Sequence, residues 1–173
     1  MKYPEILTPR SVEPIELLPS GREVMVPKAT PRFRPWPPDA MPEDRYGKDV
    51  LDLDGEMVFA ELAILRIFQR AGWEGRWIDT YGRRYLTNYW PHPVNEPMPA
   101  EQREILGRIR KEAGIDGGCF DVFCWRDRAN IFVESKRKGH DHFNRNQRAW
   151  LAAALRVNIP VDRFLIVEWT LNA

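Results

Sequence analysis

Three residues near the middle of the chain have the types and spacing that metal-assisted chemistry needs. Glu134 and Lys136 stand two residues apart at the end of the apolar run from Ile131 to Val133. Because side chains alternate between the two faces of a strand, Glu134 and Lys136 share a face and lie ~7 Å apart. Asp121 belongs to the preceding run, which is the expected neighbouring strand. Two carboxylates and an ammonium group are costly to bury together, and a divalent cation is the simplest way to hold the carboxylates side by side.

The place of this acid-x-lysine pattern in the chain carries more information than the pattern itself. An acid two residues before a lysine is common on exposed strands, but here three apolar residues lead directly into it. A buried strand that becomes charged at its end places those charges at the rim of a sheet, where ligand sites form. We therefore expect Asp121, Glu134 and Lys136 to meet at one edge of a central sheet.

Other polar residues have both a functional and a structural interpretation. Glu61 lies at the edge of the apolar stripe of a predicted helix, and the pattern alone favours a position at the boundary with water over one in a site. Gln147 and Trp150 are three residues apart on a later helix and face the same way. However, Asn144 and Gln147 also have the spacing of a helix-capping box, and Trp150 suits a core.

Apolar periodicity and turn residues predict the elements that position these side chains. The first helix has Asp52 or Asp54 as its cap and Gly72 as its stop, and Gly114 ends the second helix. In chain order the predicted elements are a helix over residues 55–71, a hairpin of residues 73–80 against 84–89, a loop over 91–99, a helix over 100–113, the central strand pair, a helix over 145–157 and an interior strand over 163–169. This order predicts an α/β fold with helices packed against a central mixed β-sheet.

The first fifty residues differ in composition from the rest of the chain. They contain ten of the fifteen prolines, and proline at this density blocks helix interiors and sheet ladders. We therefore divide the chain into a proline-rich arm, residues 1–50, with little regular structure and no catalytic group, and a domain, residues 51–173. The arm would be ordered only if Phe33 and Trp36 dock onto the domain or onto a partner.

Composition limits the environment in which the protein works. No apolar run approaches the ~20 residues of a membrane span, and the first ten residues lack the apolar centre of a signal peptide. Cys119 and Cys124 are five residues apart on a predicted strand and point to opposite faces, which disfavours a disulfide. The chain therefore has the features of a reduced, cytoplasmic protein without a membrane partner.

Positive charge is concentrated around the candidate site. The net charge of the whole chain is +1, but between Arg126 and Arg148 seven basic residues accompany only three acids. A localised basic patch is typical of a phosphate-binding surface, and charge alone favours that interpretation no more than a solvated face.

Three segments taken together resemble the PD-(D/E)xK nuclease superfamily, and more narrowly its virus-type replication-repair nuclease (VRR-NUC) family. They are residues 118–122, 132–136 and 147–150, and the resemblance spans about residues 56–169. In that family a glycine and a Pro-Asp strand precede an acid-x-lysine strand and a Gln-x-x-Trp helix. Phe120 stands where the family usually has proline, a departure that concerns the turn before Asp121 and not a metal ligand.

The resemblance implies a restriction-endonuclease-like core and metal-dependent hydrolysis of phosphodiester bonds in DNA, of a structure-selective or repair and recombination type. Asp121, Glu134 and the main-chain carbonyl of Ser135 would hold Mg²⁺ or Mn²⁺, ions that prefer hard oxygen ligands. Lys136 would orient the attacking water or stabilise the developing charge. Gln147 would form a hydrogen bond near Lys136.

The same resemblance assigns roles at the edges of the site. Glu61 matches the acid on the first core helix of the family and would bind a second metal ion or a water molecule on the metal. Lys138, Arg145 and Arg148 would contact flanking phosphates. The expected partner is DNA, with RNA as an alternative. Cleavage of both strands of a duplex usually needs two sites, so a homodimer is a further expectation.

Other functions are compatible with parts of the sequence. The chain could be a nucleic-acid-binding module that keeps the nuclease fold without cutting, or a scaffold that binds partners through the arm. His140 and His142 could bind zinc with the cysteines or begin an HNH-type nuclease site. However, Cys119 and Cys124 point apart, and no histidine follows His142 to complete an HNH site.

Overall fold

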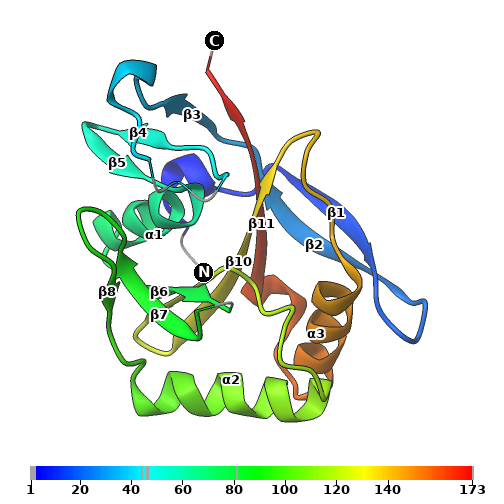
Figure 1. The fold of residues 1–173 in the computed structure, drawn as a ribbon. Coiled ribbons are helices and arrows are strands. Elements are labelled where there is room, and N and C mark those ends of the chain that lie inside the picture. Colours follow the sequence, from blue (N-terminus) through cyan, green and yellow to red (C-terminus); the bar gives the residue numbers. More distant parts are fainter. Residues whose placement is uncertain (1–2, 44, 46, 81, 173) are drawn as a thin grey trace.

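The protein is built on a mixed β-sheet that has helices against both faces (Figure 1). The computed structural model describes residues 3–43, 45, 47–80 and 82–172. Within these residues there are three α-helices: α1 (Ala60–Arg70), α2 (Ala100–Ala113) and α3 (Arg145–Arg156). The eleven strands of the described residues are β1 (Ser11–Glu16), β2 (Glu23–Ala29), β3 (Arg32–Pro35), β4 (Leu51–Leu53), β5 (Glu56–Val58), β6 (Glu74–Asp79), β7 (Arg84–Asn88), β8 (Val94–Asn95), β9 (Val122–Arg126), β10 (Ala129–Arg137) and β11 (Phe164–Leu171). None of the described helices is long and apolar enough to span a membrane.

The strand that carries the acid-x-lysine pattern lies at the centre of the sheet. The strand order is β5-β4-β3-β11-β10-β9-β6-β7-β8, and β2 carries the β1–β2 hairpin alongside β11. β10 runs parallel to β11, with Phe132 opposite Phe164, and antiparallel to β9, with Val133 opposite Val122. This architecture agrees with the predicted α/β class and mixed sheet.

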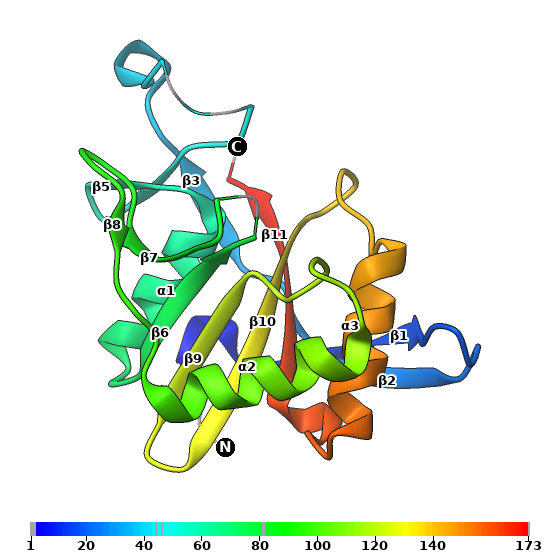
Figure 2. The same ribbon diagram turned by 60° about the horizontal axis from the view of Figure 1, so that its bottom comes forward.

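Apolar residues on the central strands feed two cores, one on each face of the sheet. Val122 of β9 and Val133 of β10 belong to the core that includes α1. Phe123 and Phe132, one position away on the same strands, belong to the core with α2 and α3, and their stacked rings lie 4.2 Å apart. Figure 2 shows α2 crossing in front of these strands. Because both faces are covered, the strands are continuously apolar until they reach the charged end of β10.

The predicted start of the first helix at residue 55 is wrong. The helix begins at Ala60, because the residues before it form the β4–β5 hairpin. Asp54 and Gly55 form the turn of this hairpin, with φ angles of 57° and 86°. Asp52 accepts a hydrogen bond from the N–H of Gly55 in the same turn and therefore does not cap a helix. Asp-Gly is a favoured sequence for such a two-residue turn. The predicted stop is confirmed, since Gly72 follows the end of α1 with a φ of 80°.

The other predicted elements are largely confirmed. β6 and β7 form the expected hairpin, although Tyr81 in its turn lies outside the described residues. α2 ends at Gly114, which has a left-handed φ of 64°, and α3 begins with the Asn144–Gln147 capping box. β11 is an interior strand as predicted. The segment 91–99, expected to be a loop, contains the short strand β8, which pairs with β7.

The expectation of little regular structure in residues 1–50 is wrong. β1, β2 and β3 all lie in this range, and both β2 and β3 pair in parallel with β11. Prolines are tolerated here because, for example, Pro14 lies on the edge strand β1 and Pro31 lies between β2 and β3. Phe33 is buried against Trp169, with ring centroids 6.1 Å apart. Trp36 is partly buried and packs against the same core, so the expected condition for order, docking of Phe33 and Trp36, is met.

Candidate active site

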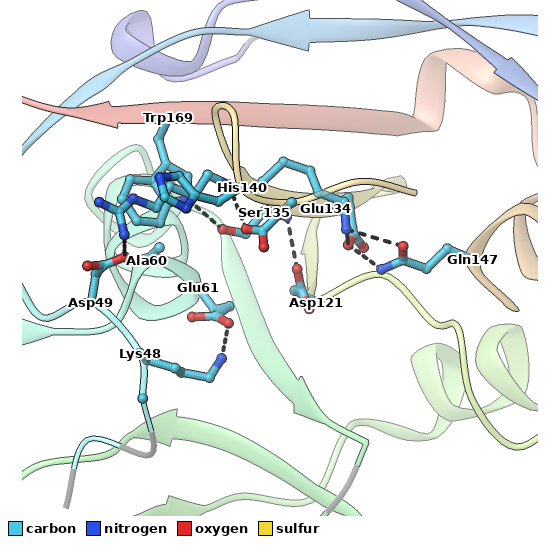
Figure 3. Close-up of a pocket in the computed structure, with 14 residues that line it drawn as sticks. Lys48, Asp49, Ala60, Glu61, Asp121, Glu134, Ser135, His140, Gln147 and Trp169 are labelled. Atoms are coloured by element: carbon cyan, nitrogen blue, oxygen red, sulfur yellow. Dashed lines mark hydrogen bonds and ion pairs between the residues drawn. The ribbon is translucent and has the colours of Figure 1, made fainter. Parts of the chain in front are cut away.

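The charged end of β10 opens into a cavity of about 410 Å³. Its walls come from the segment before β4, the first turn of α1, the ends of β10 and β11, and the first turn of α3 (Figure 3). All residues predicted to be catalytic or to bind metal line this cavity. They are Glu61, Asp121, Glu134, Ser135, Lys136 and Gln147.

Asp121 lies directly before β9 and is fixed against the end of β10. Its Oδ2 accepts a hydrogen bond of 2.9 Å from the main-chain N–H of Ser135, and its main-chain carbonyl accepts one of 2.7 Å from the N–H of Ile78. The pairing of β9 with β10 ends at Val122, so Asp121 comes level with Glu134. The predicted meeting of Asp121 with the acid-x-lysine strand is confirmed.

Glu134, Lys136 and Gln147 form a connected network. Glu134 is only 1% exposed, and its Oε1 accepts hydrogen bonds from Nζ of Lys136 at 2.8 Å and from Nε2 of Gln147. Oε1 of Gln147 accepts hydrogen bonds from Nζ of Lys136 at 3.2 Å and from the N–H of Asn144 at 3.1 Å. Gln147 therefore has both of the predicted roles, because one side chain completes the capping box of α3 and contacts two residues of the site.

The carboxylates at the centre of the cavity lack enough neutralising partners. In the described residues, Oε2 of Glu134 is buried without a hydrogen-bond partner. Burial, followed by the charge of Asp121, raises the pKa of Glu134 well above its usual value. Burial and the charge of Glu61 raise the pKa of Asp121 to about 7. These groups resist carrying negative charge together, so a bound cation would stabilise the site.

Glu61 points into the cavity from the first turn of α1, as the resemblance implies (Figure 3). It is 9% exposed, so the boundary position that the helix pattern alone favoured is wrong. Its Oε1 forms an ion pair with Nζ of Lys48, which Figure 3 shows reaching Glu61 from the side of the cavity away from Gln147. Burial acts to lower the pKa of Lys48, but the carboxylate of Glu61 outweighs this effect. The net result is a pKa above the usual value for lysine, so the ammonium stays charged.

Several cavity residues were missed by the sequence patterns. Lys48 lies in the segment that was expected to contribute no catalytic group, and it lines the cavity. Asp49 pairs with Arg137 at 2.6 Å, and Nε1 of Trp169 donates a hydrogen bond of 3.0 Å to Oγ of Ser135. His140 also lines the cavity. These contacts join residues up to 88 positions apart, and no local spacing could reveal them.

The donor set fits a hard divalent cation. Five acidic side chains line the cavity against three lysine and arginine side chains. No group of three or more His, Cys, Asp or Glu side chains in the described residues is arranged to hold a metal ion. A cation would therefore be held by two carboxylates, Asp121 and Glu134, together with a main-chain oxygen. The unpartnered oxygen of Glu134 and the purely oxygen character of these donors suit Mg²⁺ or Mn²⁺.

The chain just before Asp121 is held by close packing against α3. A Cβ atom on Gly118, whose φ is 85°, would lie 2.3 Å from the main-chain oxygen of Asn146, so only glycine allows this approach. Phe120 is fully buried and stacks on Trp150 with ring centroids 5.5 Å apart. The core interpretation of Trp150 is therefore confirmed, and Phe120 anchors this segment through its ring.

The three residues predicted to contact phosphates lie outside the cavity. Lys138 follows β10 and Arg145 opens α3, and both are exposed. Arg148 is partly neutralised by Glu16 of the β1–β2 hairpin, with Nη1 and Oε2 3.1 Å apart. Lys138 and Arg145 therefore lie on the surface beside the site, whereas Arg148 forms an ion pair with another part of the protein.

Comparisons with known proteins do not assign a family. No protein-family model matches the chain, and no curated protein matches it. The resemblance of the three segments to a nuclease family therefore stays a prediction. The function has to be inferred from the chemistry of the cavity.

Proposed function

We propose that this protein is a metal-dependent nuclease with a restriction-endonuclease-like core, and that it hydrolyses phosphodiester bonds in DNA. The observation that carries the proposal is the meeting of Asp121, Glu134 and Lys136 in one cavity, where an oxygen of buried Glu134 has no hydrogen-bond partner among the described residues. The resemblance to the VRR-NUC family supports the same activity. Phosphodiester cleavage needs an activated water and a positive charge near the phosphate, and this donor set can supply both.

Asp121 and Glu134 would hold the cation, together with the main-chain carbonyl of Ser135. When bound, Mg²⁺ or Mn²⁺ would supply the Lewis-acid charge that stabilises negative charge developing on the phosphate. The N–H of Ser135 fixes one oxygen of Asp121, and Gln147 fixes one oxygen of Glu134. The carboxylates are therefore oriented by the protein before a cation arrives, which lowers the cost of reorganisation.

Lys136 would act on the water and on the phosphate. An ammonium group has three donors, and Lys136 uses two of them on Glu134 and Gln147. No hydrogen bond among the described residues uses the third, which would serve an attacking water molecule or a phosphate oxygen. Because its side chain is 11% exposed, this charge is poorly screened by solvent and acts more strongly than a surface lysine would.

The surroundings of the cavity fit a nucleic acid as partner. Lys138 and Arg145 are exposed on either side of the loop that leads from β10 to α3, where they would contact flanking phosphates. We include RNA as an alternative substrate and a homodimer as the form that would cut both strands. Cys119 and Cys124 are free thiols, which fits work in a reducing compartment such as the cytoplasm.

Cleavage of a panel of labelled DNA structures with Mg²⁺ or Mn²⁺ tests the proposal. Glu134→Ala should abolish both cation binding, measured by calorimetry, and cleavage. Lys136→Ala should keep cation and DNA binding but slow cleavage by roughly 10²-fold or more, because its ammonium acts on the water and the phosphate. If Glu134→Ala cuts as fast as the unmodified protein, with contaminating nuclease excluded, the proposal is wrong. A protein that binds DNA but no cation would instead be a binding module.

A further inference from the structure

A second lysine reaches the carboxylates from the N-terminal part of the chain. Lys48 pairs with Glu61, and its Nζ lies 5.2 Å from the ring centre of Trp77 and 5.6 Å from that of Phe59. Two aromatic faces and a carboxylate thus surround one ammonium group, which is the arrangement of a built cation site. The ion pair and the two rings give the ammonium group a defined place in the cavity wall, while the side chain of Lys48 is 41% exposed.

Lys48 and the residue that follows it both form contacts that hold them in place. The N–H of Lys48 donates a hydrogen bond of 2.8 Å to the carbonyl of Arg45, and the next residue, Asp49, forms a 2.6 Å ion pair with Arg137 at the end of β10. The segment is therefore tied to the strand that carries Glu134 and Lys136. This anchoring keeps the ammonium of Lys48 beside Glu61.

We propose that Lys48 takes the place of a second metal ion, so that the site binds one divalent cation, held by Asp121 and Glu134. This inference rests on the proposed nuclease function. Glu61 is engaged by an ammonium group, and a metal ion bound to it would have to displace that group or remain beside it against charge repulsion. Lys48 is thus a positioning residue that removes Glu61 from the metal ligands.

The charge balance of the cavity supports a single ion. Five acidic side chains face three lysine and arginine side chains, so one divalent cation makes up the difference. A second ion would leave the cavity with an excess of positive charge before substrate enters. With one cation bound, the ammonium groups of Lys48 and Lys136 would supply the other positive charge that the phosphate of the substrate meets.

The number of Mn²⁺ ions bound per chain, measured by calorimetry and by electron paramagnetic resonance, tests the proposal. The unmodified protein should bind one ion. Lys48→Met keeps an unbranched side chain between the two aromatic rings but removes the charge, so Glu61 becomes available and the variant should bind two. Lys48→Arg keeps the charge and should bind one. Glu61→Gln should still bind one, because Glu61 is not a ligand of that ion.

Lys28→Met is the matched control. Lys28 also pairs with glutamates, Glu13 and Glu168, but lies outside the cavity lining, so its replacement should leave the count at one. Circular dichroism identifies the folded variants. If Lys48→Met fails to fold, Lys48→Gln removes the same charge, and a count of two ions in that variant decides for the proposal and a count of one against it.

Different results separate this inference from the proposed function. Two ions in the unmodified protein, loss of the ion in Glu61→Gln, or a single ion in folded Lys48→Met would overturn the inference while leaving a metal-dependent nuclease intact. An unmodified protein that binds no ion and does not cut would overturn the proposed function as well. One ion that is lost in Asp121→Asn but kept in Glu61→Gln supports both.

Discussion

Gln147 donates a hydrogen bond from Nε2 to Oε1 of Glu134, while its own Oε1 completes the capping box of α3 at the N–H of Asn144. The same Oε1 also accepts a hydrogen bond from Lys136. One side chain therefore closes the start of a helix and fixes two residues of the candidate active site. The placement of α3 and the geometry of the acid-x-lysine strand are coupled through this residue.

Gln147→Ala should affect both stability and catalysis. The loss of its share of the capping box should cost about 1 kcal/mol of the free energy of unfolding. Cleavage should slow by roughly tenfold or more, because Glu134 and Lys136 lose the group that orients them. Urea unfolding and single-turnover cleavage with Mn²⁺ measure the two effects.

Asn144→Ala separates these effects. Oδ1 of Asn144 accepts a hydrogen bond of 2.9 Å from the N–H of Gln147, but Asn144 makes no contact with Glu134 in the described hydrogen bonds. Its replacement should cost about 1 kcal/mol of stability and change the cleavage rate by less than about twofold. Equal losses of cleavage in the two variants would mean that the helix start matters and the side chain of Gln147 does not.

The buried carboxylates should make the metal-free protein sensitive to pH. The pKa of Asp121 is about 7 in the folded protein, against an ordinary value of 3.8 for the unfolded chain, so between these values the folded state binds more protons than the unfolded state. Stability should therefore fall as pH rises from about 4 to about 7. In EDTA, Asp121→Asn should flatten this fall and raise the melting temperature at neutral pH. A steeper fall in Asp121→Asn would show that the carboxyl group of Asp121 is not its cause.

The sequence predicted the centre of the site well because local rules apply there. Alternation along a strand put Glu134 and Lys136 on one face, and their ion pair of 2.8 Å follows from it. Asp121 came level with them because adjacent strands in the chain tend to pair. Helical spacing placed Gln147 at the start of the third helix. The sequence predicted its contact with the site and its part in the capping box as two alternatives, and the structure has both.

The rest of the site depends on contacts that local rules do not reach. A high proline content shows where strand pairing is difficult, but it does not show which strands can still pair. The sequence patterns therefore missed β2 and β3, which pair with β11, and did not reveal Lys48 in the same segment. The start of the first helix was placed too early because the apolar stripe outweighed the turn signal at Asp54 and Gly55. Glu61 was ambiguous because its partner, Lys48, came from the segment that was set aside.

The N-terminal strands should contribute to global stability. Phe33 is 4% exposed and packs on Trp169, whose Nε1 in turn contacts Ser135 in the cavity. Phe33→Ala should therefore cost about 3 kcal/mol or more in urea unfolding, as is usual for a buried aromatic residue. Val12→Ala on β1, where the side chain is 50% exposed, should stay within about 0.5 kcal/mol. A Phe33→Ala protein as stable as the unmodified one would show that the N-terminal strands contribute little to global stability.

Salt dependence should separate the surface cations from one another. Each phosphate contact releases about one counterion, so neutralising Lys138 or Arg145 should weaken DNA binding and lower the slope of log affinity against log salt by about one. Arg148→Gln should change the slope less, because Glu16 already pairs with Arg148. Glu16→Gln frees Arg148 and should steepen the slope, and this gain should vanish when Arg148 is also replaced. Fluorescence anisotropy with labelled DNA in EDTA measures these slopes without cleavage. Equal slopes in all the variants would show that DNA approaches the cavity over another surface.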